Sequence, residues 1–250
     1  MFQLQEIKIS KKVLAVFLVS TLCLCIIHYF GSVDFFLNFL SNIGLNSIKD
    51  TLEKTVNHNG DSNLRRLIFW ITIIDIFYLI IPAILIIFIF KQKLSDYGLR
   101  LKLEPNWWKI YFLFMLIMFP LVFIFSGTET FQAKYPFYHI PKGNSLWPNF
   151  FLWELFYFSQ FFCLEFFFRG FMIHGLKKEI GFYSILVMTI PYCMIHFGKP
   201  FPETISAIIA GLVLGYISYR NRSIFLGFLL HITVALSMDL ISLWRKGFFD

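Results

Sequence analysis

Long apolar segments alternate with short polar ones along most of the chain. Each apolar segment holds about 16 to 27 residues, close to what an α-helix needs to cross a hydrocarbon core of about 30 Å. The pattern predicts seven membrane-spanning helices, over residues 13–30, 67–90, 110–126, 150–176, 182–197, 204–219 and 223–244.

A further apolar stretch, residues 33–45, is shorter than the seven and predicts an interfacial or re-entrant eighth helix. The first segment is too long for the apolar core of a signal peptide, so we expect a retained anchor. The predicted fold is an all-α polytopic membrane bundle of about seven or eight transmembrane helices.

Composition agrees with the hydropathy pattern. The 250 residues are 58% hydrophobic and 20% aromatic, and mean hydropathy is +0.69. This apolar share exceeds that of an ordinary soluble domain, which predicts an integral membrane protein in contact with the lipid bilayer. The net charge is +7, but no basic stripe is interleaved with aromatic residues, so no nucleic-acid partner is expected.

The loop charges predict an orientation. With seven spans, 12 lysines and arginines fall on the side of the N-terminus and nine on the other side. Because cytoplasmic loops carry the excess of basic residues, the N-terminus is expected to be cytoplasmic. The expected location is a bacterial cytoplasmic membrane.

The segment 163–170 reads CLEFFFRG and places two ionisable residues in a phenylalanine-rich helix. Glu165 and Arg169 are four residues apart, so they share one helix face and form an ion pair. Ionisable groups inside a membrane cost at least about 2.5 to 3.5 kcal/mol and usually face a bundle interior, where they carry function. The alternative is a structural pair that only joins helices.

Two histidines supply partners from other helices. His196 and His231 lie in two further apolar segments, and either could be a simple interhelical hydrogen-bonding residue. Together with Glu165 they predict a shared site, in which a carboxylate takes a proton from water while one imidazole orients that water. The second imidazole stabilises an oxyanion, and such a set suits amide hydrolysis. Glu203 is interpreted as a helix N-terminal acid, with an accessory catalytic role as the alternative.

The order of these motifs resembles a known family. EFFFRGF, then PYCMIHFGKP, then GYISYRNRSIFLGFLLH resemble the CPBP or Abi family of intramembrane proteases, which includes the type II CAAX prenyl endopeptidases. The resemblance covers about residues 150–240. No repeat or low-complexity linker divides the chain, so one membrane domain is expected, with scaffold helices in residues 1–147 and the catalytic helices in residues 148–250.

The resemblance assigns residues, with two departures. Glu165 and Arg169 match the second glutamate and the arginine of the family motif, and Tyr192 and His196 match its aromatic residue and histidine. Leu164 stands where the family has its first, water-activating glutamate. Ala235 stands where an asparagine assists the last histidine, here His231. Glu165 is therefore expected to act as the base. Asp239, two turns after His231, is expected to support that histidine.

Three function classes remain open. The first is an endopeptidase that hydrolyses a membrane-associated peptide or protein through Glu165, His196 and His231. The second is an inactive pseudoprotease that binds a peptide, lipid or partner protein, because Leu164 and Ala235 cannot replace the family residues. The third is haem ligation by the two histidines. No cofactor is expected, and zinc stays open although no HExxH motif occurs. The sequence names neither the substrate nor the oligomeric state.

Overall fold

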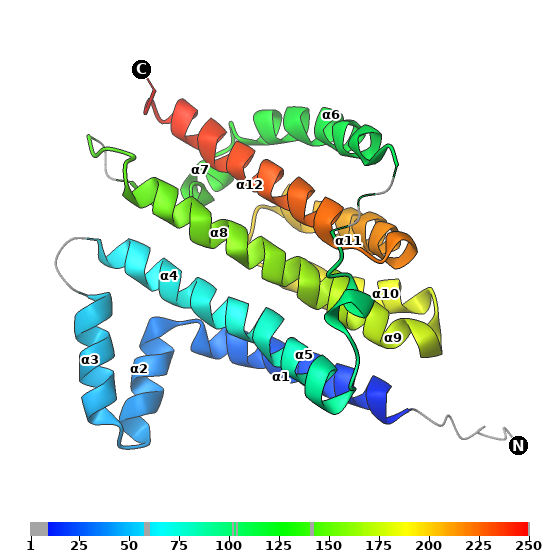
Figure 1. Cartoon of the computed structure of the whole chain (residues 1–250). Helices are drawn as coiled ribbons and strands as arrows, with labels where there is room; N and C mark the ends of the chain where they lie inside the picture. Colours follow the sequence, from blue (N-terminus) through cyan, green and yellow to red (C-terminus); the bar gives the residue numbers. More distant parts are fainter. Residues whose placement is uncertain (1–9, 58–60, 102, 104, 141–142, 250) are drawn as a thin grey trace, which may run out of the picture.

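The computed structural model describes residues 10–57, 61–101, 103, 105–140 and 143–249, and these form helices and connecting loops with no strand (Figure 1). Segments η1, η2 and η4 are π-helical, and η3 is a 3₁₀-helix. The elements are α1 (Lys11–Phe30), α2 (Val33–Asn42), α3 (Asn46–Val56), α4 (Ser62–Asp75), η1 (Ile76–Ile80), α5 (Ile81–Ile84), η2 (Leu85–Ile89), η3 (Leu94–Tyr97), α6 (Trp107–Phe125), α7 (Glu129–Lys134), α8 (Asn149–Glu165), η4 (Phe166–Met172), α9 (Ile173–Ile180), α10 (Tyr183–Met194), α11 (Phe201–Asn221) and α12 (Phe225–Arg245).

Membrane-spanning helices account for most of this bundle and confirm the expected all-α polytopic fold. In the described residues, six continuous helices are long and apolar enough to cross a membrane. They are Lys11–Phe30, Ser62–Ile89, Trp107–Phe125, Asn149–Ile180, Phe201–Asn221 and Phe225–Arg245.

The helix expected over residues 182–197 is shorter than the sequence indicated. Helix α10 has 12 residues and is therefore about 18 Å long, less than the roughly 30 Å of a hydrocarbon core. A turn follows it, in which Gly198 has φ +84°, and then α11 begins. The apolar pattern missed this end because apolar residues continue into the turn.

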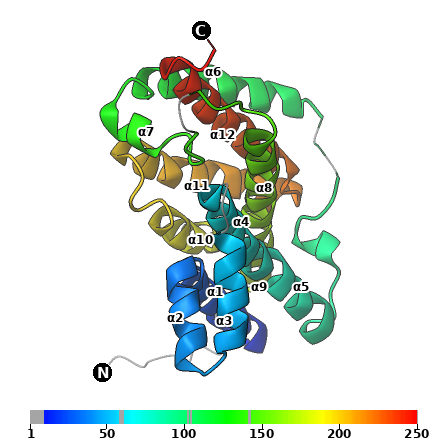
Figure 2. The same cartoon turned by 90° about the vertical axis from the view of Figure 1, so that its left-hand side faces the viewer.

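The stretch 33–45 forms α2 and the loop that leads to α3, and these two helices make a hairpin across the ends of α1 and α4 (Figures 1 and 2). The hairpin is anchored by Val33, Leu37 and Val56, which form a small buried cluster. Helix α2 has 10 residues, too few for a span. An interfacial position for this hairpin stays a prediction.

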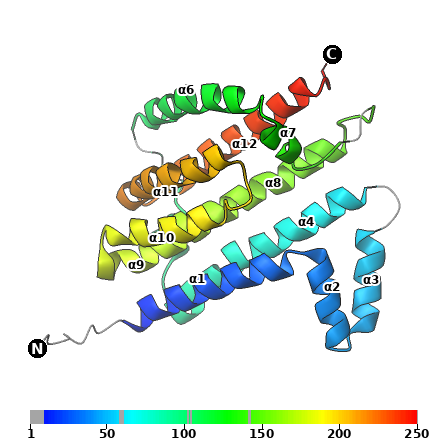
Figure 3. The ribbon, with the colours of Figure 1, turned by 180° about the vertical axis from the view of Figure 1, so that it is seen from behind.

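A continuous helix built from α8, η4 and α9 forms the centre of the bundle. Two opposite views place α8 between α4 and α12 (Figures 1 and 3). Its phenylalanines Phe166, Phe167, Phe168 and Phe171 are fully buried, and the ring of Phe167 stacks on Tyr78 with 4.5 Å between centroids. One core cluster joins these residues to others from α1, α10 and α11. The central helix therefore packs against both halves of the chain.

Helices α10 and α11 pack closely because α11 presents two glycines to α10. A Cβ atom at Gly211 would lie 2.9 Å from Thr189 Cγ2 and 3.2 Å from the Tyr192 ring. One at Gly215 would lie 2.8 Å from Ile185 Cγ2. Small residues thus let the two helices approach, as the sequence indicated.

We expect Gly215→Leu to lower the free energy of unfolding by about 1 to 3 kcal/mol, because the added side chain overpacks the α10–α11 contact. The measurement is denaturant-induced unfolding of the purified protein in detergent micelles. Val213→Leu, at an exposed position of the same helix, is the control and should unfold like the wild type. Equal unfolding of Gly215→Leu and the wild type would show that the close contact is absent.

Candidate active site

The ion pair that the sequence predicted lies at the junction of α8 and η4. Glu165 is the last residue of α8, and Arg169 lies in the π-helical segment that follows. Arg169 Nη1 is 3.2 Å from Glu165 Oε1, and the two side chains are 0% and 1% exposed. π-Helical segments are rare and frequent at functional sites. The two charges therefore compensate each other where neither meets solvent.

His231 brings a third group to this pair from α12. Its Nδ1 atom lies 2.8 Å from Glu165 Oε1. The approach depends on Gly227, one turn earlier, because a Cβ atom there would lie 2.3 Å from Glu165 Oε2. Glycine is thus required where the carboxylate of Glu165 meets the backbone of α12.

Tyr192 of α10 links the two histidines. Its hydroxyl group lies 2.9 Å from His231 Nε2, and its carbonyl oxygen lies 2.8 Å from His196 Nδ1. Its ring covers the guanidinium group of Arg169, with Cζ 3.8 Å from the ring centroid. Such a cation–π contact further stabilises a desolvated arginine.

These contacts define which nitrogen atoms are available for chemistry. His196 donates from Nδ1 to a carbonyl oxygen, so in the neutral imidazole Nε2 carries the lone pair. His231 has both nitrogens engaged, since Nδ1 faces a carboxylate and Nε2 accepts from the Tyr192 hydroxyl group. Of these two histidines, His196 is therefore the one whose Nε2 atom has no hydrogen-bond partner among the described residues.

Both histidines line a cavity of about 380 Å³. Helix α6 contributes apolar side chains to its lining, including those of Ile117, Met118 and Leu121. The tyrosine and ionisable side chains of the lining come from α8, α10, α11, α12 and the loops next to them. They are Tyr135, Tyr157, Tyr192, His196, Lys199, Glu203 and His231.

The six residues expected at the site divide into three groups. His196, His231 and Tyr192 line the cavity. Glu165 and Arg169 contact His231 and Tyr192 from behind, outside the described lining. Asp239 lies apart: its Oδ2 atom is 3.3 Å from Trp153 Nε1, and its carboxyl group adjoins that of Glu154. None of the contacts described for Asp239 brings it to His231.

The two departures from the family pattern are placed differently. Leu164 is 4% exposed and belongs to the main core cluster. Ala235 lines the cavity, so its methyl group replaces a polar side chain there. The polar side chains of the cavity therefore come from other positions.

A second polar cluster, which the sequence did not predict, lies on the cavity wall. Glu203 accepts a hydrogen bond from Tyr135 Oη at 2.6 Å, and Lys199 Nζ is 2.6 Å from its other oxygen. Burial raises the pKa of Tyr135 well above its usual range, and the nearby Tyr157 and Glu203 add to the shift. Tyr135 therefore remains a hydrogen-bond donor at neutral pH. The i, i+4 spacing of Lys199 and Glu203 was the only signal of this cluster in the sequence.

Among the described residues, no group of three or more His, Cys, Asp or Glu side chains is arranged to hold a metal ion. A zinc site built from His196, His231 and a carboxylate was left open by the sequence, and it stays untested.

Comparison with known proteins identifies the segment that carries this site. Residues 145–237 match the family model described as type II CAAX prenyl endopeptidase Rce1-like. Over this segment, which is less than half of the chain, the sequence is similar to the CAAX protease family. The match contains Glu165, Arg169, Tyr192, His196 and His231. No curated protein and no solved structure matches the chain.

The contact between Gly227 and Glu165 can be tested by coupling. We expect Gly227→Ala to lower the free energy of unfolding by about 1 to 3 kcal/mol, because the new methyl group overlaps the carboxylate. In a Glu165→Ala, Arg169→Met background, where carboxylate and cation are both gone, the same change should cost much less. The measurement is detergent-phase unfolding of the four proteins of the cycle. Equal costs in the two backgrounds would contradict the described contact.

Proposed function

We propose that the protein is an intramembrane endopeptidase that hydrolyses a peptide bond of a membrane-associated protein or peptide. The observation that carries the proposal is the connected set Glu165, His231, Tyr192 and His196. The last three of these residues line a largely apolar cavity. The set lies within the segment that matches the CAAX protease family. A buried polar network of this kind favours function over simple packing.

The contacts support distinct roles for the two histidines. His196 orients the attacking water, because its Nε2 atom accepts a hydrogen bond from that water. His231 stabilises the oxyanion once it is protonated, and Glu165 beside Nδ1 balances the charge. Glu165 is 1% exposed and lies behind His231. It therefore acts as a positioning residue, through the imidazole of His231.

A pseudoprotease is the second candidate, and one observation favours it. Leu164 and Ala235 remove two polar groups that the resemblance associates with catalysis, and Ala235 does so in the cavity lining itself. In that case the cavity would bind a membrane-associated peptide or lipid without cleaving it. Tight binding of peptides from the library described below, with no product formed, would favour this function.

We expect purified protein to cleave members of a library of quenched, membrane-anchored peptides, and His196→Ala, His231→Ala and Glu165→Gln to lower kcat by about 10²- to 10⁴-fold. Product formation in vesicles measures this, with unfolding midpoints to verify that each variant is folded. His28→Ala changes an exposed histidine at the end of α1 and is the matched control. Full activity of the His196 and His231 variants would contradict the proposed site.

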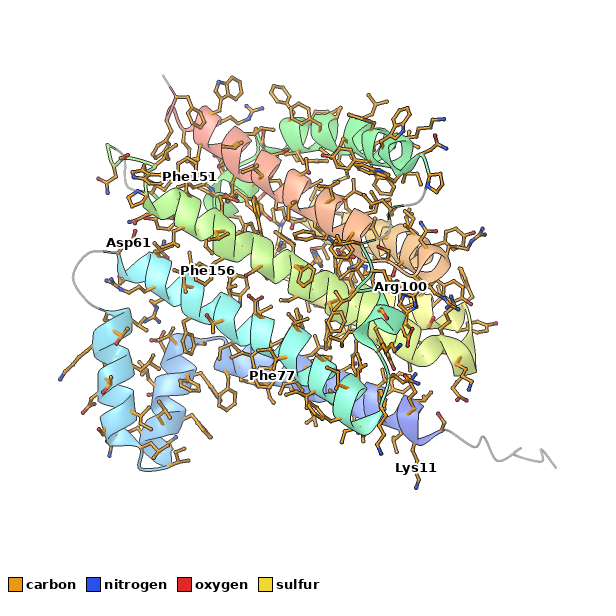
Figure 4. All side chains as sticks on the ribbon, viewed as in Figure 1. Lys11, Asp61, Phe77, Arg100, Phe151 and Phe156 are labelled. Atoms are coloured by element: carbon orange, nitrogen blue, oxygen red, sulfur yellow. The ribbon has the colours of Figure 1, made fainter. Side chains whose placement is uncertain are left out.

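The orientation in the membrane is proposed from the loop charges. Lys11 and Arg100 lie toward the end of the bundle where α1 begins, and Asp61 lies toward the opposite end (Figure 4). Lys8 and Lys102, which also count toward the basic side, lie outside the described residues. We propose a cytoplasmic N-terminus in a bacterial cytoplasmic membrane, with α10 as the short seventh crossing.

This orientation predicts that the C-terminus lies on the side opposite to the N-terminus. Alkaline phosphatase fused after residue 250 should be active in bacterial cells, because the enzyme matures only outside the cytoplasm, and green fluorescent protein fused before residue 1 should fluoresce. An inactive C-terminal phosphatase together with a fluorescent N-terminal fusion would show an even number of crossings.

A further inference from the structure

The cavity is lined by a carboxylate as well as by the two histidines, and the roles described so far do not use that carboxylate. We propose that Glu203 is the base that takes the proton from the attacking water, a role that rests on the endopeptidase function proposed above. Among the cavity-lining residues that the structure describes, Glu203 is the one carboxylic acid. His196 and His231 line the same cavity.

The position of Glu203 differs from that of Glu165 in exposure. The Glu203 side chain is 20% exposed, whereas that of Glu165 is 1% exposed and lies against Arg169, His231 and the backbone at Gly227. Water can therefore reach Glu203 directly. Leu164, at the position of the family's first glutamate, is buried in the core and supplies no oxygen atom.

Two neighbours hold the Glu203 carboxylate in a fixed orientation. Tyr135 Oη donates to Oε2 at 2.6 Å, and Lys199 Nζ is 2.6 Å from Oε1. Each oxygen atom of a carboxylate has two lone pairs, so both retain one for a water molecule.

The turn between α10 and α11 fixes Glu203 relative to His196. Thr204, the next residue, donates from its hydroxyl group to the carbonyl oxygen of His196 at 2.8 Å. His196 is in turn held by the carbonyl oxygen of Tyr192. The base and the histidine that orients water are therefore placed by one short segment of the chain.

A purely structural role in the first turn of α11 explains these contacts less well. An acid at this place is favourable beside the positive end of the helix dipole wherever its side chain points. The carboxylate does not cap the helix: no side-chain capping bond is formed at the start of α11, where Pro200 is the N-cap residue. It lies instead in the cavity wall, bonded to a tyrosine from the loop after α7.

Hydrolysis through Glu203 proceeds by addition of water to the peptide carbonyl group and then cleavage of the C–N bond. The water oxygen forms a bond to the carbonyl carbon of the substrate, and one water proton moves to Glu203. The π electrons of the carbonyl group move to its oxygen, which becomes the oxyanion stabilised by His231. When the C–N bond breaks, the oxyanion restores the carbonyl group and the nitrogen atom takes the proton from Glu203. The products are a carboxylic acid and an amine, and Glu203 is again ionised.

Chemical rescue tests this role, because a missing base can be replaced by a small carboxylate from solution whereas a lost structural contact cannot. We expect Glu203→Ala to lower kcat for the quenched peptides at least 100-fold with KM changed less than threefold. Added sodium formate should raise the kcat of Glu203→Ala at least tenfold, in a concentration-dependent way. Glu203→Asp should keep more activity than Glu203→Ala. Glu129→Gln, at an exposed position of α7, is the matched control and should behave like the wild type.

The outcomes separate this role from the proposed function. If the wild type cleaves the peptides and Glu203→Ala cleaves them equally well, the role of Glu203 is overturned and the endopeptidase function stands. A folded but inactive Glu203→Ala variant that formate does not rescue would also overturn it, in favour of a structural role. No turnover by the wild type would remove the endopeptidase function, and the base with it.

Discussion

The buried charge of Glu165 is the constraint on which the site depends. A carboxylate with 1% exposure is stable only if its charge is compensated, and Arg169 and His231 both approach the same oxygen atom. The arginine comes from the same helix and the histidine from α12. The ion pair therefore also determines how the central helix and α12 pack.

Several other features follow from this requirement. Gly227 lets α12 come close enough for His231 to contact Glu165. Tyr192 covers the arginine and at the same time sets the orientation of both imidazoles. The fully buried phenylalanines of η4 exclude water from the charges, which strengthens their attraction. The cavity thus receives two oriented histidines whose supporting charges lie outside it.

The sequence predicted those parts of the structure that depend on local patterns. Six spans were visible as long apolar runs, and the pairing of Glu165 with Arg169 followed from helical spacing. The contact between Tyr135 and Glu203 joins residues 68 positions apart, and no local pattern marks it. The end of α10 was misplaced because hydropathy does not change at the turn before α11. The expected support of His231 by Asp239 rested on spacing along α12 alone. In the structure the Asp239 carboxyl group accepts a hydrogen bond from Trp153 of α8, a contact that spacing along α12 does not indicate.

The pairing of Glu165 with His231 is tested most directly by ¹⁵N NMR of protein labelled at its histidine rings, with the His231 signals assigned by their loss in His231→Gln. The carboxylate beside Nδ1 and the hydroxyl group beside Nε2 predict that the neutral form of the ring carries its proton on Nδ1. In Glu165→Gln this preference should be lost. A proton on Nε2 in the wild type, or an unchanged spectrum in Glu165→Gln, would contradict the account.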